Sequence, residues 1–379
     1  MLYIDSFESL QQTCAALGDS DWIALDTEFL REKTYYPKLC LVQIATPERV
    51  ACIDPLAIED LSPLFELLYN ERITKVMHAA RQDMEIFYHL RGTLPAPVFD
   101  TQIAALLLGY PDQIGYGNLV REVLGVSLDK LHTRADWSQR PLSTEQLRYA
   151  ADDVVYLVQV YQQMNGKLAT LGRLDWLTED FENLTRVELY SNLPAGAWLR
   201  VRAANRLKGP ALSVLQALAS WREQLAQDQD RPRGWLLRDD LLIEIARHLP
   251  KSLSGLGKIR GLPERTLQKH GKRLLALVEA AREQAPQPSP KTEFRQRLSP
   301  SQEALVDVMM AVVRLSGAEN ELNPAVLASR KQLEQLATGA SDVEALHGWR
   351  RKLVGERLLS LLDGRLSVSV VDGRLRIES

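Results

Sequence analysis

Cysteine is scarce in this chain, which has only three among its 379 residues. Cys14, Cys40 and Cys52 are odd in number and show no paired ligand spacing, so we expect neither a disulfide framework nor a zinc site. A chain without either is suited to a reducing compartment, and we expect it in the cytoplasm.

Long apolar runs are also missing. No uninterrupted stretch approaches the roughly 20 residues that a membrane-spanning helix needs, so we expect no membrane partner. The start, M-L-Y-I-D-S-F-E-S-L, is acidic and lacks a basic segment, and it therefore does not predict a secretion signal. The sequence contains no G-x-S-x-G elbow and no Walker-type loop, which argues against the hydrolases built on those motifs.

Length and charge divide the chain. A chain of 379 residues exceeds one ordinary hydrophobic core, so two or three domains are expected. Residues 1–204 carry 18 Lys and Arg against 28 Asp and Glu, residues 205–285 carry 15 against 9, and residues 286–379 carry 13 against 12. This pattern suggests carboxylates for metals in the first part and phosphate contacts in the second, although a solvated basic face would explain the charge equally well.

The first 170 residues alternate strand-like and helix-like stretches. Short β-rich segments bounded by polar residues or proline occur at 22–27, 40–46 and 50–54. The gaps between them are too short for a crossover helix, so we expect neighbouring antiparallel strands. Further elements are expected as a strand at 73–78 and helices near 60–70, 82–91, 101–109 and 116–124. The order predicts an α/β fold with a mixed sheet flanked by helices.

A long helix is predicted after Ser143, which forms a capping box with Gln146 three residues later. An apolar stripe at helical spacing follows this start. Tyr149 and Asp153 are four residues apart and therefore lie on one flank of the stripe, whereas Asp152 falls on another. The helical phase thus selects Asp153 rather than its neighbour.

Beyond residue 205 the sequence predicts helices, over 212–227, 239–248 and 263–283. The proline-rich stretch A-P-Q-P-S-P-K at 285–291 indicates a linker. G-E-R-L-L-S-L-L at 355–362 repeats the pattern of G-K-R-L-L-A-L-V at 271–278, which suggests two related helical modules. The D-G turn near the C-terminus predicts a terminal hairpin.

Four acidic residues and one tyrosine carry the functional hypothesis. Asp26 and Glu28 alternate in W-I-A-L-D-T-E, so a strand would project both from one face. Alone, the pair would indicate a strand end facing solvent, and Asp83 would indicate an acid at a helix start. Together with Tyr149 and Asp153 they supply oxygen ligands for two hard divalent cations and a phenol to orient a water. The set predicts metal-dependent cleavage of phosphodiester bonds.

Other candidates have weaker support from the sequence. His78 and Trp137 are candidate substrate-binding residues, although packing around the site explains both as well. G-L-G-K-I-R-G at 255–261 lies between predicted helices with no preceding strand, so it does not predict a dinucleotide site. It could present backbone amides with Lys258 or Arg260 to a phosphate, or it could be a plain loop.

Three segments resemble the exonuclease motifs of the ribonuclease D family, the tyrosine subclass of the DEDD 3′→5′ exonucleases. They are D-T-E-F at 26–29, H-A-A-R-Q-D at 78–83 and D-W-S-Q-R-P-L-S-T-E-Q-L-R-Y-A-A-D-D-V at 136–154. The resemblance implies a ribonuclease H-like exonuclease domain over 1–204, followed by two mainly α-helical domains. Residues 205–285 resemble the family's helicase-and-ribonuclease-D C-terminal (HRDC) domain, 286–294 would be a linker, and 295–379 resemble a divergent second copy.

The resemblance also implies the chemistry. Asp26 would bridge two metal ions, Glu28 and Asp153 would complete the first metal site, Asp83 would support the second, and Tyr149 would hold the attacking water. Oxygen ligands suit Mg²⁺ or Mn²⁺. The implied enzyme is a monomeric 3′→5′ exoribonuclease that releases nucleoside 5′-monophosphates from precursors of transfer RNA and other small structured RNAs. One alternative is a DNA-directed exonuclease, which has the same acids. The other is a non-catalytic RNA-binding adaptor, and the intact set of acids argues against it.

Overall fold

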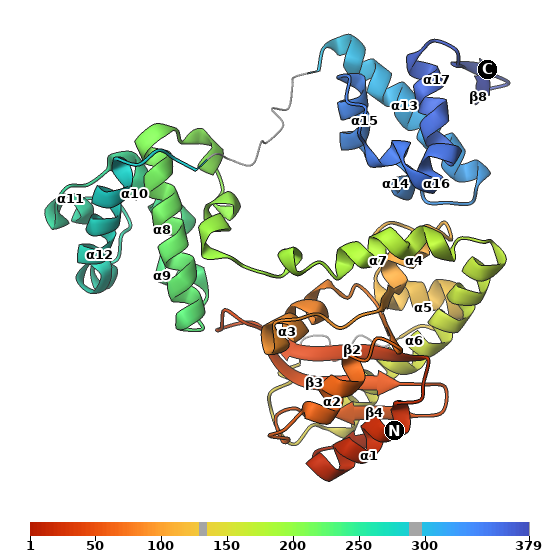
Figure 1. The fold of residues 1–379 in the computed structure, drawn as a ribbon, viewed down its shortest axis with the longest axis horizontal. Coiled ribbons are helices and arrows are strands. Elements are labelled where there is room, and N and C mark those ends of the chain that lie inside the picture. The colour runs from red at the N-terminus through yellow and green to blue at the C-terminus, as the bar shows by residue number, and fades with distance from the viewer. Residues whose placement is uncertain (129–134, 288–297, 379) are drawn as a thin grey trace.

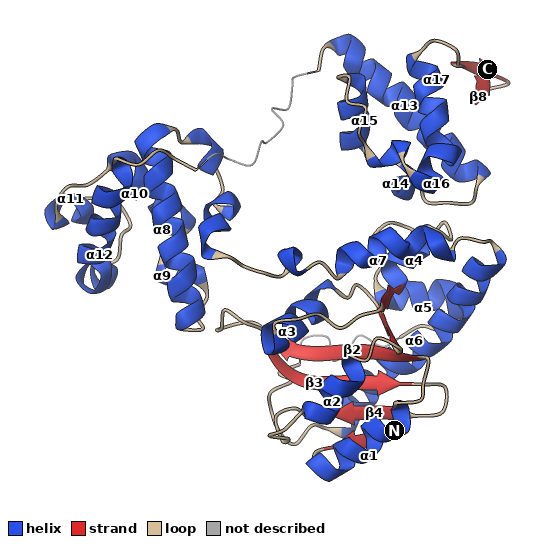
Figure 2. Cartoon of the chain, in the orientation of Figure 1, coloured by secondary structure: helices blue, strands red, loops and turns tan. Residues whose placement is uncertain are grey.

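The computed structural model describes residues 1–128, 135–287 and 298–378. An α/β domain is followed by two helical modules (Figure 1), and strands are confined to the first domain and the C-terminal hairpin (Figure 2). The predicted fold class is confirmed. Within the described residues, no helix is both long and apolar enough to cross a membrane.

The α/β domain is built on a six-stranded mixed sheet in the order β1-β4-β3-β2-β5-β6. Its strands are β1 (Leu2–Ile4), β2 (Trp22–Leu30), β3 (Lys38–Ala45), β4 (Val50–Ile53), β5 (Thr74–Met77) and β6 (Val98–Asp100). The predicted antiparallel neighbours β2, β3 and β4 are confirmed, while β5 runs parallel to β2. Strands β1 and β6 were not predicted, because three residues are too few to show a period of two.

Helices cover both faces of this sheet. One face packs against α1 (Phe7–Leu17), α2 (Ser62–Leu68) and α3 (Arg81–Arg91). The other face packs against α4 (Thr101–Leu106), α5 (Tyr116–Leu124) and the long α6 (Thr144–Thr170), which crosses β2, β3 and β4. The predicted capping box of Ser143 and Gln146 starts α6. Because successive side chains of β2 point to opposite faces, Ile23 and Leu25 pack against α1, α2 and α3, and Ala24 faces α6.

An arginine fastens the segment that leads into α6. Arg140 donates through Nη2 to Asp54 at the end of β4 and to the carbonyl of Cys40 in β3, each at 2.7 Å. Burial disfavours ionised Asp54, but hydrogen bonds from Arg140 and Tyr3 outweigh it and lower the pKa of this carboxyl. This charge pair therefore fixes the start of α6 against the sheet.

The two helical modules share one element order. The first contains α8 (Gly209–Asp228), α9 (Arg233–Leu236), α10 (Asp239–His248), α11 (Leu253–Gly257) and α12 (Glu264–Arg282). The second contains α13 (Pro300–Glu319), α14 (Pro324–Leu327), α15 (Arg330–Ala337) and α17 (Glu356–Leu362), followed by the predicted hairpin β7 (Ser367–Val371) and β8 (Arg374–Glu378). The first three helices start at 209, 233 and 239 in one module and at 300, 324 and 330 in the other, a constant offset of 91 residues. Of the predicted linker 286–294, only residues 286 and 287 are described.

The repeated sequence pattern has a packing reason. Its first residue is a glycine in both modules, Gly271 in α12 and Gly355 before α17. A Cβ added at Gly271 would lie 2.8 Å from a Leu253 methyl, and one added at Gly355 would lie 2.5 Å from the carbonyl oxygen of Ala345. In both modules, the glycine lets the last helix approach the short helical turn before it.

The second helical module shares a hydrophobic core with the α/β domain. One cluster joins buried residues of α4–α6 to Val306, Met309 and Val326. Trp349 stacks on Trp176 with ring centroids 4.5 Å apart. Residues beyond α6, including α7 (Thr178–Leu184), continue this contact surface, so the second module and the α/β domain form one packed unit.

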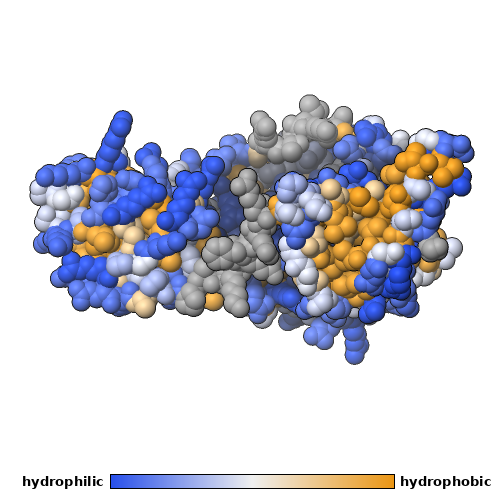
Figure 3. Space-filling model, turned by 90° about the horizontal axis from the view of Figure 1, so that it is seen from above, coloured by the Kyte–Doolittle hydropathy of each residue, from blue (hydrophilic) through white to orange (hydrophobic). Residues whose placement is uncertain are grey.

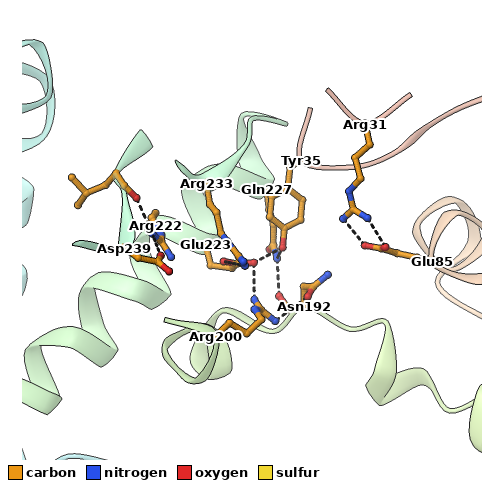
Figure 4. A network of polar contacts seen from close by, with 11 residues as sticks. Arg31, Tyr35, Glu85, Asn192, Arg200, Arg222, Glu223, Gln227, Arg233 and Asp239 are labelled. Carbon is orange, nitrogen blue, oxygen red and sulfur yellow. Dashed lines mark hydrogen bonds and ion pairs between the residues drawn. The ribbon is translucent and has the colours of Figure 1, made fainter. Parts of the chain in front are cut away.

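The first helical module docks through polar contacts instead (Figure 4). The Tyr35 hydroxyl, in the loop between β2 and β3, donates to the fully buried Glu223 of α8, which also pairs with Arg200 at 2.7 Å. Asp230, just after α8, accepts from the backbone N–H groups of Tyr35 and Tyr36. The β2–β3 loop thus connects the sheet to this module.

The two modules also differ in the polarity of their surfaces. Seen from above, hydrophilic atoms dominate the first module, whereas a continuous hydrophobic area covers much of the second (Figure 3). This agrees with the basic excess of residues 205–285 and the balanced charge of residues 286–379.

We predict that Arg140→Met destabilises the α/β domain. The substitution leaves the Asp54 carboxylate buried without its cation, which costs about 3–5 kcal/mol. Urea unfolding at pH 7, followed by the fluorescence of the domain, should show a lower midpoint. Adding Asp54→Asn to the variant should recover part of the loss; an unchanged midpoint in Arg140→Met would contradict this role.

Candidate active site

A cavity of about 480 Å³ opens between the sheet and α6. Five of the residues singled out from the sequence line it: Asp26, Glu28, His78, Tyr149 and Asp153. Asp26 and Glu28 come from β2, while Tyr149 and Asp153 come from one flank of α6. The structure therefore brings together residues that are up to 127 positions apart, and the helical phase selected the acid that lines the cavity.

The fourth acid is held from the opposite side of β2. Asp83 lies in the first turn of α3 and is buried. Thr27 stands between Asp26 and Glu28 in the strand, so its side chain points to the other face, where its hydroxyl donates to the Asp83 carboxyl. Thr27 thus couples Asp83 to the strand that carries the other two acids.

The four acids raise one another's pKa values. Burial and then Asp153 raise the pKa of Asp26 to about 8, and burial followed by the other three carboxylates raises that of Glu28 to about 9. Burial and Asp152 raise the pKa of Asp153 to about 7, and burial with Asp26 raises that of Asp83 well above its usual range. Several negative charges cannot coexist here without compensation, so the site favours bound cations.

Two aromatic residues support the α6 side of the cavity. Trp137 is 2% exposed, and its ring centroid lies 6.2 Å from that of Tyr149. This burial does not fit the predicted direct contact of Trp137 with substrate; Trp137 packs behind Tyr149 instead. Tyr116, at the start of α5, donates its hydroxyl to the backbone carbonyl of Asp153 and lines the cavity. These contacts limit the movement of the helix turn that carries Asp153.

His78 lines the cavity, but the protein engages both of its ring nitrogens. Nε2 lies 3.0 Å from the carbonyl oxygen of Ile114, and Nδ1 lies 2.9 Å from the Thr101 hydroxyl. Burial lowers the pKa of this imidazole, so it is neutral at pH 7 and donates through Nε2. His78 thereby anchors the turn before α5, and only the edge of its ring remains for a substrate.

The donor set of the cavity suits hard divalent cations. Its acidic side chains offer carboxylate oxygens, the ligands of Mg²⁺ and Mn²⁺. No group of three or more His, Cys, Asp or Glu in the described part of the chain is close enough to enclose an ion alone.

Lys258 and Arg260 lie elsewhere. Both are exposed residues of the first helical module, in the turn between α11 and α12, and neither lines the cavity. The expected loop at 255–261 begins as the end of α11, since Ser252 caps that helix through Gly255. Their proposed phosphate contacts therefore concern RNA bound outside the cavity.

Sequence reasoning missed several residues of the cavity wall: Thr27, Gly115, Tyr116, Gly117 and Asn118. Thr27 stands inside the D-T-E segment, where alternation alone places it on the opposite face from the acids. In the I-G-Y-G-N run at the start of α5, a Cβ added at Gly115 or Gly117 would meet nothing within 4 Å, so these glycines leave the cavity wall open. Only the tertiary fold shows that this helix start faces Asp153.

Comparison with known proteins agrees with this geometry. A family model described as 3′-5′ exonuclease matches residues 1–169, and an HRDC domain model matches residues 211–278. The chain is 42% identical to the ribonuclease D of Sphingobium indicum, over 99% of this chain and 97% of that protein. It is 41% identical to the ribonuclease D of Nitrobacter hamburgensis, over 99% of both.

A solved structure extends the likeness to the whole fold. The crystal structure of Escherichia coli RNase D, an exoribonuclease involved in structured RNA processing, superimposes with a TM-score of 0.82 at 34% identity. The match covers 96% of this chain and 98% of that one. The paired domains, the acidic cavity and these near full-length matches agree. The chain belongs to the ribonuclease D family of 3′→5′ exoribonucleases, which generally use divalent metal ions.

Proposed function

We propose that this enzyme shortens RNA from its 3′ end by a two-metal mechanism and releases nucleoside 5′-monophosphates. The observation that carries the proposal is a cluster of four acids whose pKa values are raised by burial and neighbouring carboxylates: Asp26, Glu28 and Asp153 line one cavity with Tyr149, and Asp83 lies behind β2. Such a cluster is stable as anions only with cations, and a phosphodiester brings further negative charge that cations offset.

Each acid has a role in this proposal. Asp26 would hold both ions, Glu28 and Asp153 would complete one site, and Asp83 would support the other from behind β2. When bound, the ions sharpen the water nucleophile and stabilise charge on the leaving 3′ oxygen. Tyr149 orients that water in line with the last phosphodiester, and Trp137 behind it keeps the phenol in place. Mg²⁺ or Mn²⁺ suits these oxygen donors better than Zn²⁺ does.

RNA would reach the cavity across the first helical module. A second cavity, of about 470 Å³, is lined by Arg31, Arg200 and Arg233, each of which pairs with a glutamate, Glu85 or Glu223. Arg31 follows Glu28 by three residues along β2 and its loop, roughly 10 Å of extended chain. Beside this cavity, Trp235 of α9 is 65% exposed. Arginines bind phosphates and an exposed indole stacks on unpaired bases, so this corner suits the strand that leads to the active site.

The proposed substrate class follows from the division of the chain into a part that cuts and a part that holds RNA. We propose that residues 1–204 cut and residues 205–285 hold the RNA body through phosphates and shape, whereas residues 295–379 complete the catalytic body. Precursors of transfer RNA and other small structured RNAs fit an enzyme that grips one region while trimming another. The role of Escherichia coli RNase D in structured RNA processing supports this, and we expect a cytoplasmic monomer.

The direction of trimming, the preference for RNA over DNA and the metal requirement can be tested in one experiment. We expect RNA labelled at its 5′ end to shorten stepwise from the 3′ end with Mg²⁺ or Mn²⁺, and the chelated enzyme to leave it intact. Equivalent DNA labelled in the same way is the control. Faster shortening of the DNA would favour the DNA-directed alternative.

We predict that Asp26→Asn lowers kcat by about 10³-fold or more, because it removes the ligand shared by both ions and several kcal/mol of transition-state stabilisation. Tyr149→Phe should lower kcat by about 10²-fold, since the water loses its orienting hydroxyl. Single-turnover trimming measures both, and RNA affinity by filter binding should stay within about twofold. Undiminished trimming by Asp26→Asn would refute the assignment.

We predict that the corner of the first module controls affinity. Trp235→Ala should weaken RNA binding by about 1–3 kcal/mol, because one stacked base is lost. Arg233→Gln should reduce the slope of log affinity against log salt concentration by about 1, which is the contribution of one phosphate contact. Arg314→Gln, an exposed arginine of α13, is the matched control. Deleting residues 205–379 is a poorer test, because it also removes the shared hydrophobic core.

Equal losses in Arg233→Gln and Arg314→Gln would contradict a special role for this corner. Hydrolysis of dinucleotides, which are too short to reach it, should be the same in all three variants and the parent enzyme.

We predict that the chelated enzyme loses stability as pH rises from about 4 to about 8. In the folded chain the pKa of Asp26 is near 8, above its unfolded value of about 3.9, so over this range unfolding releases protons and becomes easier. Asp26→Asn stays neutral and should exceed the parent by about 1–3 kcal/mol at pH 8. Thermal melting with and without Mn²⁺ checks this. The difference in stability between the variant and the parent should close when Mn²⁺ is added and should vanish below about pH 4. A difference that stays constant with pH would count against the linkage.

A further inference from the structure

The amide of Gln43, in β3, is the most anomalous polar group among the described residues. Its side chain is fully buried, and neither its oxygen nor its nitrogen has a hydrogen-bond partner. An unpaired buried polar group costs roughly 1–3 kcal/mol, and native proteins keep few of them. Arg222 and Glu223 each leave one atom unpaired, but both form ion pairs through their other atoms.

The position of Gln43 connects it to the acidic cavity. Gln43 is the residue of β3 directly opposite Asp26 of β2 in the antiparallel pair. Opposite residues project from the same face with Cβ atoms about 4.5–5.5 Å apart, so the Gln43 side chain lies next to that of Asp26. Leu41 and Ala45 share this face of β3, and both pack in the clusters that include residues of α6. The amide is therefore enclosed between Asp26, the sheet and the helix of Asp153.

A cation-binding carboxylate needs such a neighbour. When one oxygen binds an ion, the remaining lone pairs accept hydrogen bonds from other groups, and these outer contacts orient the ligand. The Asp26 carboxylate accepts a hydrogen bond from the backbone of Thr27. The Gln43 amide is a neutral donor already in place, and it adds no charge to the crowded site.

We propose that Gln43 is a positioning residue that donates from Nε2 to the Asp26 carboxylate and holds it in its metal-binding orientation. This rests on the proposed function, because it assumes that Asp26 binds the cations. The amide has no hydrogen-bond partner in the structure and gains one when the Asp26 carboxylate takes its metal-binding orientation. Gln43 thus lowers folding stability and strengthens metal binding.

This assignment makes the two effects of Gln43→Met opposite in sign. Methionine has a similar length and no amide to desolvate, so the chelated variant should melt at the same temperature as the parent or higher. Its affinity for Mn²⁺, measured by calorimetry on the full chain without RNA, should fall roughly 10–100-fold. The apparent metal requirement of trimming should rise by the same factor, with the KM for RNA unchanged.

Ile44→Met is the matched control, because Ile44 is the next residue of β3, is equally buried and faces the other core. It should leave Mn²⁺ affinity unchanged. Gln43→Asn keeps an amide on a shorter side chain and should retain part of the affinity. Should Gln43→Met fail to fold, Gln43→Leu serves for the same two measurements.

Three outcomes distinguish a failure of the proposed Gln43 role from a failure of the two-metal mechanism. If the parent binds Mn²⁺, Asp26→Asn does not, and Gln43→Met binds like the parent, the role of Gln43 is overturned while the two-metal proposal stands. A chelated Gln43→Met that melts several degrees lower with unchanged Mn²⁺ affinity would make Gln43 a structural residue only. If the parent itself binds no Mn²⁺, both proposals fail.

Discussion

Mutual repulsion among four carboxylates is the constraint on which the rest of this structure depends. Asp26, Glu28 and Asp153 face one cavity and Asp83 lies directly behind it, so their charges are tolerable only with cations. Such a cluster would relax apart on a flexible support. Here two acids lie on β2, which is paired on both sides within the six-stranded sheet. Contacts from Thr27 and Arg140 tie α3 and the start of α6 to that sheet, and Tyr116 ties α5 to α6. The fold therefore stores electrostatic free energy that bound metal releases.

The sequence was sufficient for the parts of the site that obey a local period. Alternation predicted that Asp26 and Glu28 share a face, and the helical phase separated Asp153 from Asp152. Contacts that depend on how elements meet could not be predicted. The hydrogen bond from Thr27 to Asp83 joins a strand to a helix 56 residues later, and Tyr116 reaches Asp153 from a different helix. Strands of three residues gave no periodic signal, and no pattern in the sequence of α13 named the surface against which it packs.

The two helical modules show how one element order serves two purposes. Each follows its long first helix with a residue of positive φ, Asp230 in the first and Glu321 in the second, 91 positions apart. Each uses this corner to touch the α/β domain. In the first module the contact is made by hydrogen bonds and ion pairs around an open cavity, and α9 keeps Trp235 exposed. In the second, Val326 at the position equivalent to Trp235 is buried in the shared core. The same geometry therefore forms a polar junction in one case and an apolar seal in the other.

The shared core also sets the order in which a working enzyme can emerge from the ribosome. The acids are all synthesised by residue 153, yet the outer surface of α4 and α6 is covered only when α13–α15 exist. Until then a nascent chain exposes apolar surface to chaperones and proteases. A message truncated before its last quarter would therefore yield a chain with every catalytic side chain and an unfinished core. The last helical module is therefore needed to complete the hydrophobic core of the domain that carries the acids.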